Sequence, residues 1–181
     1  GTIASWALGG FYFSLMPTLV RIAAGATLPL VGGLVVSALT LSGALSVLSL
    51  RSIAAGRLLG GGTVALAAGV AITLAGVEVQ LVWLMLVGTL VSGGGFGAAF
   101  SGTMRSLLPL AAPQERAALL SVFYVIGYLS FSLPAILAGY LTPIVGLAVA
   151  AKGYGTAVIL MALASMPAIA VSRGATSRHR Q

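Results

Sequence analysis

Charged residues are scarce in this sequence, and cysteine and aspartate are absent altogether. Only 6% of the 181 residues are charged, whereas about a quarter of the residues in a soluble domain are charged. Because a soluble protein could not cover its surface with so few charges, we expect the chain to be surrounded by lipid. The lack of cysteine excludes disulfides and thiolate chemistry. Since two glutamates are the only acidic residues, no metal or other cofactor site is expected.

The residues that catalysis requires are also missing. The only histidine is His179, in the polar segment at the end of the chain. Ser101 lies in the pattern Ala-Phe-Ser-Gly, which is similar to the serine motif of intramembrane proteases, but a serine nucleophile needs a base within hydrogen-bond reach. The glycine run 93–97 lies inside an apolar stretch, whereas a nucleotide-binding loop follows a strand and begins a helix. The chain is therefore not expected to be an enzyme.

Long apolar runs dominate what remains. The hydrophobic fraction is 59% and the mean hydropathy is +1.13, and a membrane-spanning helix needs about 20 mostly apolar residues. Six runs meet or approach that length, over residues 3–20, 28–50, 58–77, 81–104, 117–141 and 155–171. The apolar stretch 144–151 is expected to lie at the membrane interface or to lengthen the fifth or sixth helix. We predict an all-α membrane protein with six transmembrane helices in a single domain, 1–181.

The basic residues predict how this domain is oriented. With six crossings, one side carries seven arginines and the other carries only Arg21 and Lys152; the seven are Arg51, Arg57, Arg105, Arg116, Arg173, Arg178 and Arg180. Loops rich in Lys and Arg stay in the cytoplasm, so we expect both ends there, with 172–181 as a basic cytoplasmic tail. Eight arginines against one lysine are typical of GC-rich bacteria, which points to a bacterial inner membrane. No helix has a basic face, so nucleic-acid binding is not expected.

Two similar segments suggest an internal repeat. Residues 9–14 and 94–101 each combine paired glycines with aromatic residues and a serine, and each lies in the first helix of a three-helix unit. The first of these helices would run outward and the second inward. Inverted repeats with glycine-interrupted helices at matching positions are typical of secondary transporters. We therefore predict that the six helices form two inverted three-helix repeats.

Polar and small residues on the fourth predicted helix form two faces. Gly93, Gly97 and Ser101 recur every four residues, and such a ridge lets helices approach closely in lipid. The other face carries Thr89, Ser92, Phe96 and Thr103, which lie within about 60° of one another at 100° per residue. A face of this kind is expected to line a water-filled cavity or to form hydrogen bonds with a neighbouring helix, and both interpretations stay open.

Further cavity candidates lie on the first and fifth predicted helices. Ser5, Tyr12 and Met16 share a face of the first, and Tyr124, Tyr128 and Ser132 share a face of the fifth. Tyrosine is also common in the interfacial belts of membrane proteins. Tyr124 and Tyr128 lie deeper than a belt requires, which favours the cavity. No ionisable residue lies deep in any predicted span, so the chain offers no carboxylate for proton or ion coupling.

The ordered pattern resembles the C-terminal six-helix half of a major facilitator superfamily (MFS) transporter. The resemblance depends on the order of the six spans, on Gly56 and Arg57 between the second and third helices, and on the segments 105–109, 113–116 and 137–141. In the family's signature loop, which Gly56 and Arg57 match, Ser49 replaces the first glycine and Ile53 replaces the aspartate.

That resemblance implies a function and a partner. It implies two six-helix halves in the bilayer around a cavity that opens alternately to each side, with the first, fourth and fifth helices of this half at or beside the cavity. The partner would be the N-terminal half of the same protein, and the substrate an unknown small solute or drug. Because Gly1 leads directly into the first apolar run, we expect the chain to be part of a longer protein. The alternatives are a small homodimeric transporter and a non-transporting membrane assembly subunit.

Cysteine substitutions can test the predicted topology, because the chain contains no cysteine of its own. Cysteines at Arg57, Arg116 and Arg178 should be shielded from a membrane-impermeant thiol reagent in intact cells. Cysteines at Thr27 and Lys152 should be labelled. Strong external labelling at position 116 would contradict six crossings with cytoplasmic ends.

Overall fold

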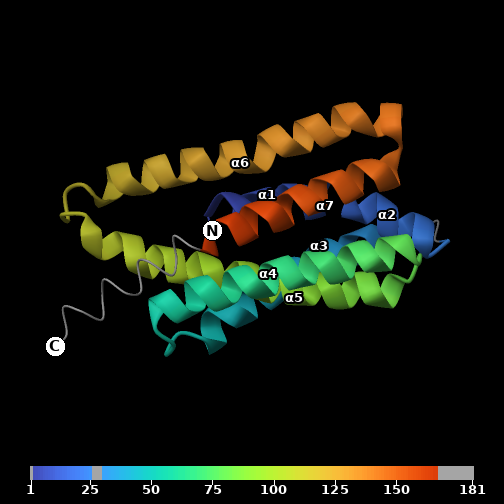
Figure 1. Ribbon diagram of the computed structural model, residues 1–181. Coiled ribbons are helices and arrows are strands. Elements are labelled where there is room, and N and C mark those ends of the chain that lie inside the picture. Colours follow the sequence, from blue (N-terminus) through green and yellow to red (C-terminus); the bar gives the residue numbers. More distant parts are fainter. Residues whose placement is uncertain (1, 26–29, 167–181) are drawn as a thin grey trace.

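The chain folds into helices joined by short connections. The computed structural model describes residues 2–25 and 30–166, and these ranges contain no strand. In chain order the elements are α1 Thr2–Ser14, α2 Met16–Ala23, α3 Leu30–Ser49, α4 Ala55–Glu78, α5 Val82–Leu107, the 3₁₀ helix η1 Leu108–Leu110, α6 Arg116–Val145 and α7 Leu147–Ala164 (Figure 1). The predicted all-helical class is confirmed for this part of the chain.

The largest difference from the predicted boundaries lies between the fifth and sixth predicted helices. α7 begins at Leu147, well before the predicted start at 155, and the predicted end at 171 lies outside the described residues. The apolar stretch 144–151 lengthens both neighbouring helices, because its first residues end α6 and its last residues begin α7. Gly146 alone separates them, with a φ of 86°. Only glycine adopts such a conformation readily.

The first predicted span is a broken helix. α1 and α2 meet at Leu15 with a bend of 46°. Pro17, in the first turn of α2, has no amide hydrogen to donate to the Phe13 carbonyl, and a helix commonly bends where this hydrogen bond is missing. The predicted helix over 3–20 is therefore present as two segments at an angle.

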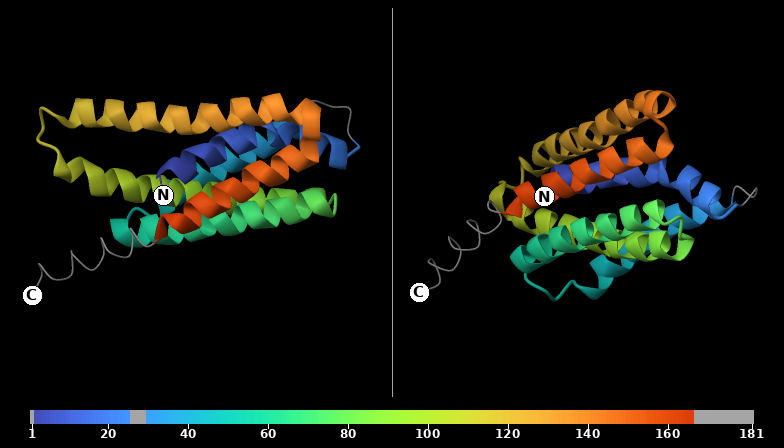
Figure 2. Two further views of the ribbon diagram at one scale, coloured as in Figure 1. Left: turned by 45° about the horizontal axis from the view of Figure 1, so that its top comes forward. Right: turned by 45° about the vertical axis from the view of Figure 1, so that its right-hand side comes forward.

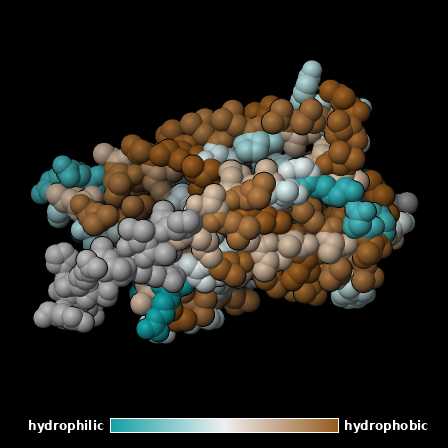
Figure 3. Space-filling view, in the orientation of Figure 1, coloured by the Kyte–Doolittle hydropathy of each residue, from teal (hydrophilic) through white to brown (hydrophobic). Residues whose placement is uncertain are grey.

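The lengths and surfaces of the helices are those of a multi-pass membrane protein. α3, α4, α5, α6 and α7 are each long and apolar enough to cross a membrane, and the bent pair α1 and α2 adds a sixth candidate if it is one span. Large apolar side chains cover much of the face shown in Figure 3. Leu34 on α3 and Ile136 on α6, for example, are 60% and 68% exposed. Lipid accommodates such side chains, and helices satisfy their own backbone polar groups inside a bilayer.

The helices form two groups that meet along α4 and α7. In one group α5 packs against both α3 and α4, and in the other α1 packs against both α6 and α7. The groups are joined where α7 packs on α4 and where α1 reaches α5. α6, the longest helix, lies at the edge of the molecule in all three views (Figures 1 and 2). The connections α3–α4 and α5–α6 lie at one end, and α4–α5 and α6–α7 lie at the other (Figure 1).

Glycines spaced seven residues apart bring α4 and α5 together. They are Gly62, Gly69 and Gly76 on α4 and Gly88, Gly95 and Gly102 on α5. A Cβ atom at any of these positions would collide with the backbone of the facing helix. In lipid, helices associate through such close packing and not through the removal of apolar surface from water. A period of seven is also that of two helices wrapped around each other in a left-handed supercoil.

A second pair of glycines on α5 faces α3. Gly93 lies against Leu39, and Gly97 lies against the backbone of Gly43. Ser101, the third member of the predicted ridge, is half-buried. At 100° per residue, positions 93 and 97 lie on nearly the opposite side of α5 from position 95. α5 is therefore packed between two partner helices through two separate glycine faces.

The Gly97→Ala substitution tests the contact between α3 and α5. A methyl group at this position would strike the Gly43 backbone, so we expect stability to fall by about 1–3 kcal/mol, the usual cost of overpacking. Gly94→Ala is the matched control, because nothing lies within 4 Å of a Cβ there. It should be neutral or stabilise the helix by up to about 1 kcal/mol. Unfolding in mixed detergent micelles measures both variants, and equal stabilities would contradict this packing.

Candidate functional site

An aromatic pocket lies where α1, α3, α5 and α6 converge. Its volume is about 340 Å³, within the usual range of ligand sites, roughly 300–1,000 Å³. Its lining residues are Trp6, Leu8, Gly9, Phe13, Leu39, Thr40, Gly43, Ala44, Val47, Phe96, Gly97, Phe100 and Phe131. Phe13 is 46% exposed and Val47 is 38% exposed, so the pocket opens at the surface of the helix bundle. It is the candidate substrate-binding site of this chain.

Aromatic rings from three helices, α1, α5 and α6, lie around this pocket. Phe96 and Phe100 on α5 are stacked, with ring centroids 6.1 Å apart, and Phe13 on α1 lies 6.0 Å from Phe131 on α6. Phe123 on α6 lies 6.0 Å from Phe100. Aromatic pairs at such distances attract one another beyond the effect of buried area alone. Phe13 and Phe131 form one pair, and Phe96, Phe100 and Phe123 form a connected aromatic surface.

Trp6 extends this surface to the tyrosines predicted on the fifth span. Its indole lies 5.9 Å from the ring of Tyr124 and 5.3 Å from that of Tyr128. The indole also lies directly over Gly127 of α6, where a Cβ would collide with the ring. Its Nε1 is buried and has no hydrogen-bond partner within the described residues. Tyr124 and Tyr128 thus lie beside the pocket and extend its aromatic wall, although neither lines it.

The lining of the pocket favours binding over chemistry. None of its lining residues is charged. The Thr40 hydroxyl donates to the Val36 carbonyl of its own helix at 3.0 Å. Flat apolar groups stack on aromatic rings, and a cation can lie over a ring face at a benefit of about 0.5–2 kcal/mol. A neutral or cationic molecule with a flat apolar surface therefore fits this pocket best.

Three of the predicted cavity residues meet elsewhere, in the core between α1, α4 and α5. The Tyr12 hydroxyl donates to Ser92 Oγ at 3.0 Å and lies 2.6 Å from Thr73 Oγ1. Thr89 is fully buried nearby and donates to the Met85 carbonyl of its own helix at 2.8 Å. The structure thus places Tyr12, Thr89 and Ser92 in a buried hydrogen-bonded cluster between helices and not along the aromatic pocket.

The remaining predicted residues are spread over the fold. Phe96 lines the pocket. Ser5 and Met16 are buried on α1 and α2, Ser132 is half-buried on α6, and Thr103 is buried and bonds the Ala99 carbonyl of its own helix. Gly56 and Arg57 lie in the first turn of α4, at the end of the molecule that carries the α3–α4 and α5–α6 connections.

Sequence reasoning missed most of the pocket. Trp6, Phe13 and Phe100 were not among the predicted residues, because an aromatic side chain in an apolar helix is equally compatible with lipid. Thr73 was missed for a similar reason, as an isolated threonine within α4. Its pairing with Tyr12 joins residues 61 positions apart. A signal for Trp6 was nevertheless present, since it lies about one helical turn before Gly9 of the predicted repeat segment.

No protein-family model, curated protein or solved structure matches the chain. Its function is therefore inferred from its residues and their geometry.

Removing the Tyr12 hydroxyl tests the buried cluster. Hydrogen bonds between membrane helices contribute about 0.6 kcal/mol each on average, so Tyr12→Phe should lower the free energy of unfolding by about 1 kcal/mol. Tyr128→Phe is the control, because Tyr128 is 62% exposed. Its loss of a hydroxyl should leave stability unchanged. Detergent unfolding monitored by circular dichroism measures both, and equal stability of Tyr12→Phe and the natural chain would contradict the cluster.

Proposed function

We propose that this chain is one six-helix half of a secondary transporter of the MFS type, which moves a small solute or drug by alternating access. The observation that carries the proposal is the aromatic pocket, which opens where α1, α3, α5 and α6 converge. An open pocket without charged or catalytic groups fits a wall of a binding cavity better than an active site. The flat aromatic surfaces favour a lipophilic substrate, neutral or cationic.

The pairing of the helices supports an inverted repeat. If α1–α4 is one unit and α5–α7 the other, then α1 corresponds to α5, α3 to α6 and α4 to α7. The pair α3–α5 then corresponds to α6–α1, and the pair α4–α5 corresponds to α7–α1. All four of these pairs are observed. The pair α4–α7 is its own counterpart, because α4 corresponds to α7. The pairs α6–α7 and α2–α3 have no counterparts of similar extent, since α3 with α4 and α5 with α6 pack far less. Most of the packing thus agrees with the two three-helix repeats that transporters of this type use.

The surface beside the pocket supports a second bundle as the partner. Four exposed small or polar residues of α3 form one stripe, which is Gly33, Ser37, Thr40 and Ala44. The exposed leucines of α3 form another stripe, which is Leu30, Leu34, Leu41, Leu45 and Leu48. Small residues mark contacts between helices in lipid. Thr40 and Ala44 also line the pocket. A bundle that packs on the small stripe would therefore close the pocket, while the leucines would meet lipid.

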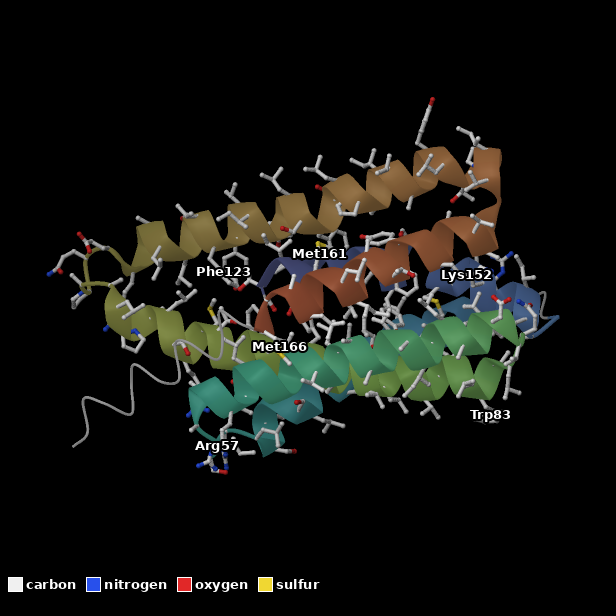
Figure 4. All side chains as sticks on the ribbon, viewed as in Figure 1. Arg57, Trp83, Phe123, Lys152, Met161 and Met166 are labelled. Atoms are coloured by element: carbon white, nitrogen blue, oxygen red, sulfur yellow. The ribbon has the colours of Figure 1, made fainter. Side chains whose placement is uncertain are left out.

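The positions of the charged residues suggest that the two halves have different roles in binding and in ion coupling. Every charged residue in the described part of the chain lies at or near a helix end. Lys152, for example, forms an exposed ion pair with Glu78, with Nζ and Oε2 2.9 Å apart. Figure 4 shows Lys152 near the end of the molecule where α6 and α7 meet. Ionisable groups deep in a membrane usually mark ion relays, so the partner half would supply the coupling residue and this half the binding surface.

Uptake by proteoliposomes tests this function. We expect this chain alone to insert into liposomes but not to transport, because alternating access requires one bundle to move against another. The chain joined to its N-terminal partner bundle should move lipophilic dyes such as ethidium, and Phe96→Ala should alter that transport without loss of folded protein. Transport by this chain alone, at the rate of the joined protein, would favour the homodimer. No transport of any dye by the joined protein would favour an assembly subunit.

A further inference from the structure

A second hollow lies between α3 and α4, away from the aromatic pocket. Its volume is about 850 Å³, and no residue lines both hollows. The lining residues are Ser46 and Leu50 of α3, Ser52, Ile53 and Ala54 of the connection, Arg57, Leu58, Gly61, Gly62 and Ala65 of α4, and Leu90, Val91, Gly94, Gly95 and Ala98 of α5. The hollow is a groove whose floor is α5 and whose walls are α3 and α4.

The packing of α5 explains why this groove exists. α5 contacts α4 through the face of Gly95 and α3 through the face of Gly93 and Gly97. Gly94 lies between these faces, and nothing is within 4 Å of a Cβ built there or at Gly61 of α4. The groove therefore has open space at Gly61 and Gly94, where small residues line it.

The outer surface of α5 indicates that the groove faces lipid. At 100° per residue, Gly94 shares a side of the helix with Trp83, Val87 and Leu90. These three side chains are 75%, 49% and 49% exposed. Trp83 and Arg57 lie at opposite ends of the α4–α5 pair in Figure 4. Tryptophan and arginine are the residues that commonly mark the two edges of the hydrocarbon layer.

One end of the groove is positively charged. Arg57 lines it and is exposed, with no ion pair within the described residues. The groove ends at the α3–α4 connection, which Arg105 holds by donating from Nη1 to the Ile53 carbonyl at 2.8 Å. Arg51 is exposed in the same connection. The N-terminal end of α4 adds a partial positive charge here, and neither the connection nor the groove contains an acidic residue.

We propose that this groove binds an anionic phospholipid, with its phosphate at Arg57 and an acyl chain on the glycine floor of α5. The arginine fork matches a phosphate in shape and charge. The small residues leave room for a linear apolar chain beside Gly61 and Gly94. Basic pockets between membrane helices bind anionic headgroups on the cytoplasmic side, which is the side that the arginine distribution predicts for this end. The site does not depend on the proposed transport function.

Native mass spectrometry of the purified chain tests the headgroup contact. The natural chain should bind dioleoyl-phosphatidylglycerol more tightly than dioleoyl-phosphatidylcholine, which has the same acyl chains. One arginine near an anionic lipid contributes about a fivefold change in affinity, so Arg57→Ala should weaken phosphatidylglycerol binding by about that factor. It should weaken phosphatidylcholine binding less, because the choline group of that lipid offsets the charge of its phosphate. Arg51→Ala removes the same charge from the same end but not from the groove, and it should have less than half that effect.

Filling the groove tests the acyl-chain contact. Gly94→Leu should weaken the binding of both lipids, because the new side chain would occupy the floor. Gly139→Leu is the control, since Gly139 is also open to a Cβ but lies on α6, and it should change neither. Circular dichroism confirms that each variant is folded. Equal affinity of the natural chain for the two lipids, an equal effect of Arg51→Ala and Arg57→Ala, or no effect of a folded Gly94→Leu would each overturn the proposal.

Discussion

Close contact between glycine faces is the constraint on which the rest of this structure depends. In lipid, apolar side chains gain nothing by leaving the solvent, so helices associate through tight packing and a few hydrogen bonds. α5 meets α4 through Gly88, Gly95 and Gly102, and it meets α3 through Gly93 and Gly97. Both hollows of the molecule follow from this arrangement. The aromatic pocket lies on one side of the contact between α3 and α5, and the groove between α3 and α4 lies on the other.

Few polar side chains are buried in this structure. Those that bond between helices lie away from the aromatic pocket, so different residues serve stability and ligand recognition. Tyr12, Thr73 and Ser92 satisfy one another in the core between three helices. Burying such hydroxyls without partners would cost about 1–3 kcal/mol each, so their pairing specifies how α1 sits on α4 and α5. The aromatic pocket, in contrast, is nearly free of polar atoms and offers ring faces. Hydrogen bonds thus determine how α1 packs, whereas the pocket offers a ligand mainly its shape and the faces of aromatic rings.

The sequence predicted the helices well and their partners poorly. Apolar run length determines how many helices can span a bilayer, so the elements were found with small errors. α7 was started too late because Lys152, Gly153 and Gly155 resemble a break. In the structure Lys152 reaches Glu78 from within the helix, near its end. The seven-residue glycine spacing was present in the sequence but hidden among 25 glycines. Pairings such as Tyr12 with Thr73 could not be predicted, because they depend on which helices meet.

The unequal lengths of α6 and α7 have a mechanical consequence. At 1.5 Å per residue, the 30 residues of α6 extend about 45 Å, whereas the hydrocarbon layer is about 30 Å thick. The 18 residues of α7 extend about 27 Å, and a single glycine joins the two helices. α6 must therefore tilt or project beyond the hydrocarbon, as long helices do under hydrophobic mismatch. Phe131 of α6 lines the aromatic pocket, and Phe123 of α6 contacts Phe100 in its wall. A change in bilayer thickness that tilts α6 would therefore change the shape of the pocket.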